Sequence, residues 1–262
     1  MKQRLRHNGF SLTEVLLATG VLAIGLVMIA MVFPVGVKLT STATERTAAA
    51  TAASEAFAKI QLFGKDPDGP AGPLSSVIKP ASVPATESAN LNLMYPSLLP
   101  GDERWYPSVS GALEKKYHWS AMVRKISDTT LQTTVFVSRL LSQNALYYDP
   151  NHSQRLAVGK WPEPVSVQIE KKIASKTLKI KPAMPNNTEY RFFTEGSVLL
   201  VSRTGALYRV VEIKSSDNVV RDLLVLDRDY AESEANIVWV VPPAAGSTRN
   251  PCIGVYQRLL EF

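Results

Sequence analysis

The chain has 262 residues, of which 45% are hydrophobic and 20% charged, which is ample for one globular core and allows two small lobes. The formal net charge is +6, but three positive charges lie at Lys2, Arg4 and Arg6, so the rest of the chain is only mildly basic. The charge is therefore weak support for a nucleic-acid partner. A single cysteine, Cys252, excludes an intramolecular disulfide and a Cys-based metal cluster, and we interpret it as a small apolar residue beside a C-terminal strand.

Residues 15–37 form an apolar run without a charged side chain. A helix needs roughly 20 apolar residues to cross a bilayer, so this run predicts a transmembrane helix. It contains Gly20, Gly25, Pro34 and Gly36, residues that are commoner in membrane helices than in soluble ones. Basic residues precede the run, which by the positive-inside rule keeps the N-terminus cytoplasmic and places everything after Lys38 outside the membrane.

Two general interpretations of this run are open. A secretory signal peptide has an apolar segment of about 7–15 residues followed by a small-residue cleavage site, and this run is longer and has Glu14 at its entrance. A plain signal anchor explains the run and its basic flank. It does not explain the residues immediately before the run.

Residues 9–15 read Gly-Phe-Ser-Leu-Thr-Glu-Val. They combine Gly9, the aromatic Phe10 and an acid, Glu14, as the fifth residue after Gly9, between a short basic leader and a long apolar helix. This combination resembles the prepilin cleavage motif of the type IV pilins and type II secretion pseudopilins. The continuation over residues 16–26 is most similar to minor pilins of the PilV type, and the resemblance covers about residues 1–60.

The resemblance implies a sequence of processing and assembly steps. A prepilin peptidase would cut between Gly9 and Phe10 on the cytoplasmic side, and the same enzyme family would methylate the new amine on Phe10. Glu14 would pair with the Phe10 amine of a neighbouring subunit and so set the axial register. The implied partners are the prepilin peptidase, other pilin or pseudopilin subunits and an inner-membrane assembly platform.

Glu14 also has a simpler interpretation. Ser11 and Glu14 match the S-x-x-E capping box, and a first-turn carboxylate favours the helix dipole. A carboxylate in hydrocarbon costs up to roughly 3 kcal/mol even on the lenient insertion scale, so an acid here also suggests a function. Capping does not account for the Gly9–Phe10 junction, and the two roles are compatible.

The predicted fold class is α+β and pilin-like, with a long N-terminal helix packed on an antiparallel β-rich domain. The expected parts are a leader at 1–9, a helix at 10–63 with its membrane span at 15–37, a proline-rich connection at 64–112 and a β-rich domain at 113–262. Nearly half of the 17 prolines lie in the connection. A 3/4 spacing predicts one buried stripe on the second half of the helix, made of Ala43, Ala50, Ala53, Phe57 and Ile60.

The β-rich domain shows alternating hydrophobicity and turn signals at intervals of about ten residues. The expected strands are 117–123, 131–141, 165–169, 178–180, 198–202, 207–213, 223–226, 237–241 and 253–260. The sequence leaves open whether 113–182 and 190–262 form one sheet or two.

The histidines are His7 in the leader, His118 in a strand, where we expect a surface or edge position, and His152 in a loop. The loop 149–153 reads Asp-Pro-Asn-His-Ser, which predicts a turn rather than a catalytic triad, because triads are normally assembled from distant segments. No zinc-protease, phosphate-loop, dinucleotide or nucleophile-elbow motif is present. We therefore predict no catalytic residue, cofactor or metal, and a chain that is not an enzyme.

A lysine cluster marks the hairpin predicted near residue 175. It consists of Lys171, Lys172, Lys176, Lys179 and Lys181. Such a patch can bind DNA electrostatically, but lysines also guard exposed strand edges, and we favour the guard. We expect no nucleic-acid partner.

The sequence thus predicts a structural minor pilin or pseudopilin. It would be a single-pass protein of the bacterial inner membrane, with a cytoplasmic leader and an extracytoplasmic C-terminal domain, that later joins a pilus or pseudopilus. The alternative is a membrane-anchored extracytoplasmic binding protein, such as an adhesin or a DNA-binding protein, or an enzyme.

Overall fold

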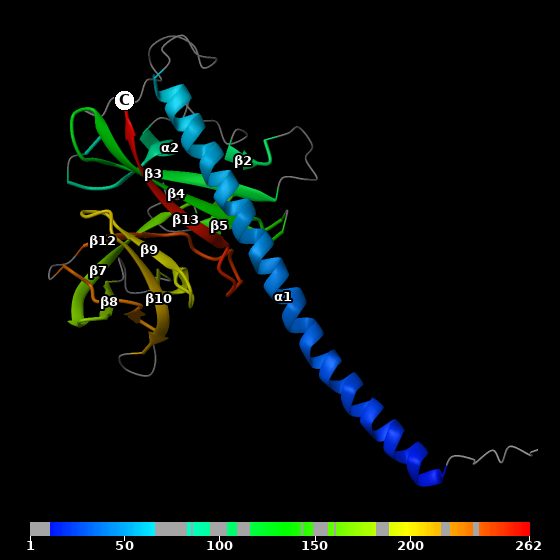
Figure 1. Ribbon diagram of the computed structural model, residues 1–262. Helices are drawn as coiled ribbons and strands as arrows, with labels where there is room; N and C mark the ends of the chain where they lie inside the picture. The colour runs from blue at the N-terminus through cyan, green and yellow to red at the C-terminus, as the bar shows by residue number, and fades with distance from the viewer. Residues whose placement is uncertain are drawn as a thin grey trace, which may run out of the picture. The chain divides into compact units, whose positions relative to one another are not determined.

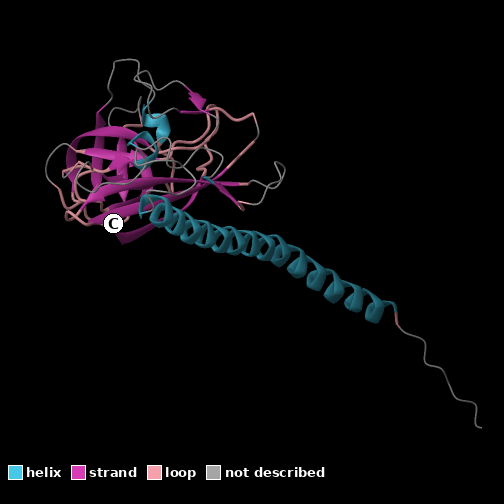
Figure 2. Cartoon of the chain, turned by 90° about the horizontal axis from the view of Figure 1, so that it is seen from above, coloured by secondary structure: helices cyan, strands magenta, loops and turns pink. Residues whose placement is uncertain are grey.

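A computed structural model describes residues 11–65, 83–84, 86–94, 104–108, 116–142, 144–148, 157–159, 161–181, 189–215, 221–232 and 236–262. The chain divides into two compact units, Met1–Thr47 and Ala48–Phe262. Figures 1 and 2 show one long helix and a domain built almost entirely of strands. The α+β class predicted from the sequence is confirmed at this level.

The long helix α1 runs from Leu12 to Lys65 without interruption and includes Pro34. It ends two residues beyond the predicted end at residue 63. At about 1.5 Å per residue it is roughly 80 Å long. Every residue from Leu12 to Thr44 is exposed, although most of them are apolar. This part of the helix therefore has no core of its own.

The second half of α1 packs inside the second unit. Its buried face consists of Ala49, Ala52, Ala53, Ala56, Phe57 and Ile60, each at most 2% exposed. Four of these are alanines, which let the helix backbone approach the sheet beneath it closely. The predicted stripe was correct for the last three of its members and wrong for Ala43 and Ala50, which are exposed.

The first sheet is antiparallel and has five strands. They are β1 (Ala89–Asn90), β2 (Trp105–Tyr106), β3 (Tyr117–Lys125), β4 (Thr130–Arg139) and β13 (Cys252–Glu261). The order is β1-β3-β4-β13, and β2 also pairs with β3. A short helix, α2 (Leu91–Met94), follows β1 and places Leu91 in the core under α1. The segment expected to be a proline-rich connection, residues 64–112, therefore contributes Leu91 to the core.

The two faces of this sheet have different neighbours. Trp119, Ala121 and Val123 alternate along β3 toward α1 and join its buried alanines in one cluster. Met122 lies on the opposite face and packs against the barrel described below. Because both faces are covered, most residues of the central strands β3 and β4 are buried, and β3 carries no charged residue before Arg124.

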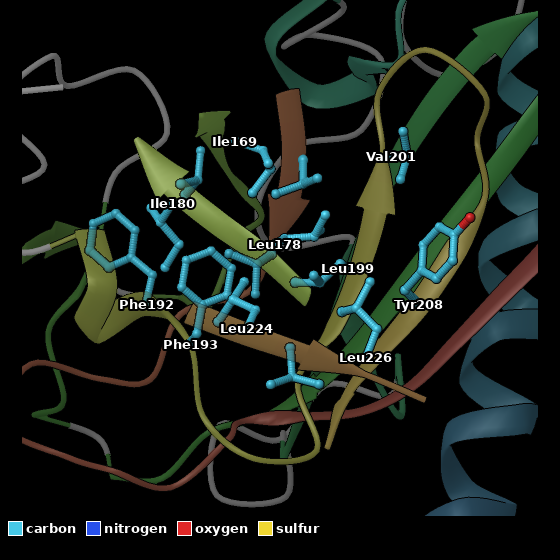
Figure 3. Packing of buried hydrophobic residues seen from close by; sticks show 14 of the residues in the cluster. Ile169, Leu178, Ile180, Phe192, Phe193, Leu199, Val201, Tyr208, Leu224 and Leu226 are labelled. Atoms are coloured by element: carbon cyan, nitrogen blue, oxygen red, sulfur yellow. The ribbon is translucent and has the colours of Figure 1, made fainter. Parts of the chain in front are cut away.

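The remaining long strands close into a barrel in the order β10-β11-β8-β7-β12-β9. They are β7 (Val165–Ala174), β8 (Thr177–Lys181), β9 (Val198–Val201), β10 (Leu207–Lys214), β11 (Leu223–Leu226) and β12 (Ile237–Val240). All of these pairs are antiparallel. Figure 3 shows the interior, where aliphatic side chains meet Phe192, the last residue of the 3-10 turn Glu189–Phe192, and Phe193, which follows it. A separate small pair joins β5 (Tyr147–Tyr148) to β6 (Ala157–Gly159).

The barrel and the sheet are joined by a small apolar cluster and a docked turn. The cluster contains Met122, Phe136, Leu200 and Val241. The turn between β9 and β10 reaches the sheet at Gly205, whose carbonyl accepts a hydrogen bond from Gln257 Nε2 at 2.7 Å. Gly205 has φ +69°, and a Cβ there would overlap the side-chain oxygen of Gln132. Only glycine fits this close approach without a shift of the sheet side chains.

Every strand predicted in the β-rich domain is present, with ends that differ by a few residues. The strands of 113–182 and 190–262 form neither one common sheet nor one sheet for each segment. β13, at the end of the chain, pairs with β4 along nearly its whole length, whereas β7 and β8 belong to the barrel. The sheet therefore combines strands from the two ends of the domain.

Candidate functional site

Two of the three residues in the predicted motif, Gly9 and Phe10, lie outside the described residues. The third, Glu14, lies in the first turn of α1. Its backbone N–H donates to Ser11 Oγ at 3.2 Å, and the Ser11 N–H donates to Glu14 Oε2 at 3.2 Å. This is the reciprocal capping box that the sequence predicts. It satisfies two N–H groups that the start of a helix would otherwise leave unpaired.

The capping box uses only one oxygen of the carboxylate. Ser11 Oγ also contacts Glu14 Oε2, at 3.3 Å. Within the described residues, Oε1 of Glu14 has no hydrogen-bond or ion-pair partner. The carboxylate can therefore cap its own helix and still accept a bond from a cation of another molecule.

The surface next to Glu14 is apolar on all sides of the helix. Exposed residues of the next three turns include Val15, Leu16, Leu17, Val21, Leu22 and Ile24, which are 49–73% exposed. α1 is the one helix among the described residues that is long and apolar enough to cross a membrane. By length and composition, a helix of this kind near the N-terminus is of the type found in membrane anchors and signal sequences.

Beyond the apolar run, the threonines of α1 hydrogen-bond to the helix itself. The hydroxyls of Thr40, Thr42 and Thr44 each donate at 2.9 Å to the carbonyl four residues earlier. Thr47 does the same to Ala43 at 3.1 Å. Because these hydroxyls already have acceptors, this stretch can enter a poorly hydrated environment at less cost than its composition suggests.

The second unit buries a polar and aromatic cluster that the sequence does not predict. His118 is completely buried, so the expected surface or edge position is wrong. Its ring stacks on Trp161 at 5.9 Å between centroids and meets the edge of Trp105 at 5.5 Å. Arg104 and Glu163 form an ion pair beside it, with side chains only 9% and 11% exposed. The sequence-based prediction of an exposed His118 failed because β3 is covered on both faces.

His118 lacks a hydrogen-bond partner on either ring nitrogen among the described residues. Burial, and secondarily the Arg104 cation, lower the pKa of His118 well below its usual value. The ring is therefore neutral in the folded state at neutral pH. No described residue hydrogen-bonds to the ring to orient it, which favours a structural role.

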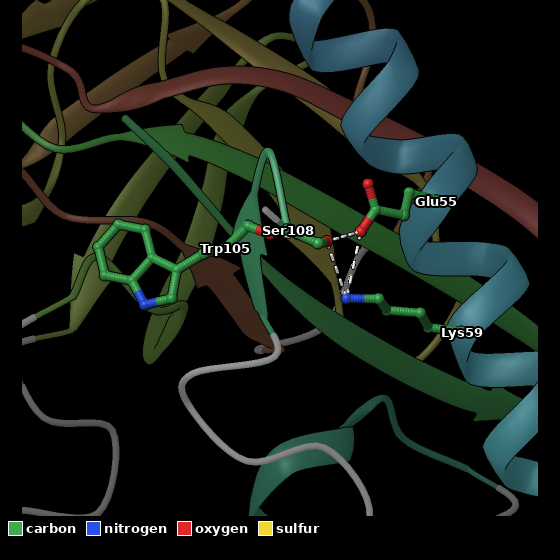
Figure 4. A network of polar contacts seen from close by, with 4 residues as sticks. All are labelled: Glu55, Lys59, Trp105 and Ser108. Atoms are coloured by element: carbon green, nitrogen blue, oxygen red, sulfur yellow. Dashed lines mark hydrogen bonds and ion pairs between the residues drawn. The ribbon is translucent and has the colours of Figure 1, made fainter. Parts of the chain in front are cut away.

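A small polar network fixes β2 to the second half of α1, as Figure 4 shows. Glu55 and Lys59 form an ion pair at 3.1 Å between Oε1 and Nζ, one helical turn apart. Ser108 donates a hydrogen bond to Glu55, and Lys59 Nζ donates to Ser108 Oγ at 3.0 Å. Such a network holds the segment that carries Trp105 and Arg104 against the domain.

The interpretation of the lysine cluster as an edge guard is wrong. β7 and β8 are strands of the closed barrel wall, where each pairs with a neighbouring strand on both sides, so neither has an open edge. Lys172 Nζ donates to the Tyr230 carbonyl at 2.6 Å. Lys179 Nζ lies 3.4 Å from Glu170 and 4.0 Å from Asp222, which partly neutralise it.

Within the described ranges, no three His, Cys, Asp or Glu side chains come together as a possible metal site. Cys252 was expected beside a C-terminal strand, and it is the first residue of that strand, β13. Burial raises the pKa of its thiol to about 12. His7 and His152 lie outside the described residues.

Comparisons with protein-family models, with curated proteins and with solved structures of other proteins found no match to this chain. Its function therefore has to be argued from its own residues. The chain combines one N-terminal helix able to cross a membrane with a C-terminal antiparallel β-rich domain that contains a barrel.

Proposed function

We propose that the chain is a structural subunit of a bacterial filament of the type IV pilus or type II secretion class, that is, a minor pilin or pseudopilin. The observation that carries this proposal is Glu14 at the start of the exposed, apolar first half of α1, a carboxylate with one oxygen that has no partner among the described residues. The leader would be removed between Gly9 and Phe10, and the Phe10 amine would be methylated. The fold would then be pilin-like, with the first half of α1 in the membrane or in the filament core.

The physical reason for assembly lies in the environment of the acid. In an apolar environment an unpaired carboxylate is costly, and a close cation repays much of that cost. The Phe10 amine of a neighbouring subunit would supply this cation. A neighbour in the wrong axial position would leave both charges unpaired, so the pair favours one register.

Assembly tests this proposal directly. The substitution Glu14→Gln should reduce incorporation into filaments to background, because the amide carries no charge for the amine of the neighbour. The matched control is Glu45→Gln, which neutralises an acid on the same helix but beyond the apolar run, and it should assemble normally. Filaments would be sheared from cells and the subunit measured by immunoblot, with membrane fractions probed for equal expression. Normal incorporation of Glu14→Gln would refute the pairing role.

Mass spectrometry of the native N-terminus separates this proposal from its alternative. A methylated N-terminal Phe10 is expected of a pilin-class subunit. An intact Met1 in the native host would instead favour an anchored extracytoplasmic binding protein, whose helix only attaches it to the membrane.

A further inference from the structure

A pocket of about 510 Å³ opens on the second unit, between the barrel and β5. Its walls come from segments far apart in the sequence, which include Tyr148 in β5, Tyr190 in the 3-10 turn between β8 and β9, Ile213 in β10 and the loop after β12. Pockets that bind small molecules usually measure about 300–1,000 Å³ and have apolar walls with a few converging polar groups. This pocket meets both criteria.

The apolar wall is formed mainly by aromatic rings that the fold holds in place. Phe193 is 4% exposed and belongs to the barrel core. The ring of Tyr148 contacts Phe192 with centroids 4.5 Å apart. Rings fixed in this way offer flat apolar surface without a further loss of side-chain entropy on binding.

The polar groups of the pocket are cationic or hydroxyl-bearing. Arg191 and Arg221 line it, together with Ser247 and Thr248, and none of its described lining residues is acidic. Within the described part of the chain, neither arginine makes a hydrogen bond or an ion pair. The guanidinium of Arg191 lies 5.9 Å from the centroid of the Tyr190 ring, which places the cation beside the aromatic wall. Guanidinium groups without carboxylate partners suit a carboxylate, sulfonate or phosphate.

The loop after β12 is fixed on one side and open on the other. Ala245 N–H donates to the Leu146 carbonyl, and Ser247 N–H donates to the Ala244 carbonyl, both at 2.9 Å. Gly246 has φ +77°, and no atom lies within 4 Å of the position that its Cβ would occupy. The loop therefore has a defined conformation, and no described atom crowds the position of a Gly246 Cβ on the pocket wall.

We propose that this pocket binds a small anion-bearing molecule with a flat apolar body, such as an aromatic carboxylate. The aromatic wall would cover the flat body, and Arg191 and Arg221 would bind the anionic group. The proposal concerns the second unit alone and does not depend on whether the chain assembles into a filament.

The probe is 6-fluoro-2-naphthoate, and its neutral isostere is 6-fluoro-2-naphthamide. Both are titrated into the full-length protein in detergent micelles and observed by ¹⁹F NMR, with protein-free micelles as the blank. The variants are Arg191→Gln, Arg221→Gln and their combination. Arg249→Gln is the matched control, since this arginine is exposed in the same loop but does not line the pocket. Each probe partitions into the micelles to the same extent for every variant, so differences in Kd between variants report binding to the protein.

We expect the naphthoate to bind with a Kd at least about fivefold lower than that of the naphthamide, and each pocket variant to weaken naphthoate binding about three- to tenfold. The amide should bind all proteins equally, and Arg249→Gln should behave as the parent protein. Absence of naphthoate binding to the parent protein would overturn the proposal. So would equal affinity for acid and amide, or unchanged affinity in the double variant when its thermal unfolding midpoint matches that of the parent.

Discussion

The two halves of α1 have nearly the same backbone and opposite surroundings. From Leu12 to Thr44 the helix exposes every side chain, including large ones such as Phe33, which is 71% exposed. In the second half, Phe57 and Ile60 are almost completely buried against the first sheet. Both halves carry large apolar side chains, but only those of the second half find their partners inside the chain.

The difference shows that hydrophobicity alone does not say where a helix is buried. The first half carries large side chains in all directions, which suits lipid or several neighbouring helices. The second half restricts its buried side chains to one face, lined by small alanines. The stability of the folded chain should therefore depend on the second unit, and the first half should matter for membrane insertion or assembly instead.

The largest expected effect comes from a buried ring in the second unit. Trp119 is completely buried in the cluster under α1, and Trp119→Ala should lower the free energy of unfolding by about 3–5 kcal/mol. The matched change in the first half is Leu22→Ala, at a residue 64% exposed, and should leave that free energy unchanged. Urea unfolding followed by far-ultraviolet circular dichroism measures both. Equal effects of the two variants would contradict the comparison.

An acid in each region provides the next test. Glu163→Gln leaves the Arg104 cation buried without its counter-charge and should cost about 2–4 kcal/mol of unfolding free energy. Glu14→Gln removes an exposed acid and should not change unfolding of the second unit. Under the proposed function it should nevertheless block assembly. A stable Glu163→Gln variant would show that the Arg104–Glu163 pair is of little importance for the fold.

A pair of glycines tests backbone fit. Gly205→Ala combines a positive φ with an overlap at Gln132, and should cost about 1–3 kcal/mol in thermal or urea unfolding. Adding Gln132→Ala should recover part of that loss, because it removes the overlap and leaves only the strained φ. Gly20→Ala, where no atom lies within 4 Å of the added Cβ, should leave unfolding of the second unit as it is. No loss in Gly205→Ala would show that the β9–β10 turn is not tightly docked.

The smallest effect is a pH dependence restricted to the second unit. His118 has a lowered pKa in the folded state, so between its unfolded value near 6.5 and that lower value only the unfolded chain takes up a proton. The free energy of unfolding should therefore fall as the pH drops below about 6.5. His118 should contribute at most about 1.4 kcal/mol per pH unit to this fall.

The variant His118→Phe keeps a ring in the stack and removes the titration. Its unfolding free energy between pH 6.5 and 4.5 should fall less steeply than that of the parent, as measured by urea unfolding at each pH. Parallel curves for the two proteins would mean that His118 is not held neutral by the fold.

The sequence predicted the elements better than their arrangement. The helix and all long strands followed from apolar periodicity, because each pattern depends on neighbouring residues only. The return of β13 to β4 and the closure of the barrel depend on contacts more than a hundred residues apart or on shape, and local patterns contain neither.

Among the site residues, too, only the features that depend on neighbouring residues could be predicted from the sequence. The capping box at Ser11 and Glu14 was predictable from its spacing, and the structure confirms it. The burial of His118 was missed, although the uncharged run from Tyr117 to Val123 is a signal of a strand covered on both faces. The Arg104–Glu163 pair and the pocket between the barrel and β5 join distant segments and left no local signal.

The position of β13 constrains how the domain can be made. Leu260 lies opposite Leu131, so a strand that is synthesised long after β3 and β4 completes the sheet to which they belong. Until then the edge of β4 is unpaired, and contacts over such long separations form slowly. A nascent chain truncated before residue 252 would expose that edge permanently, and should be removed by proteolysis or aggregate rather than persist as a native subunit.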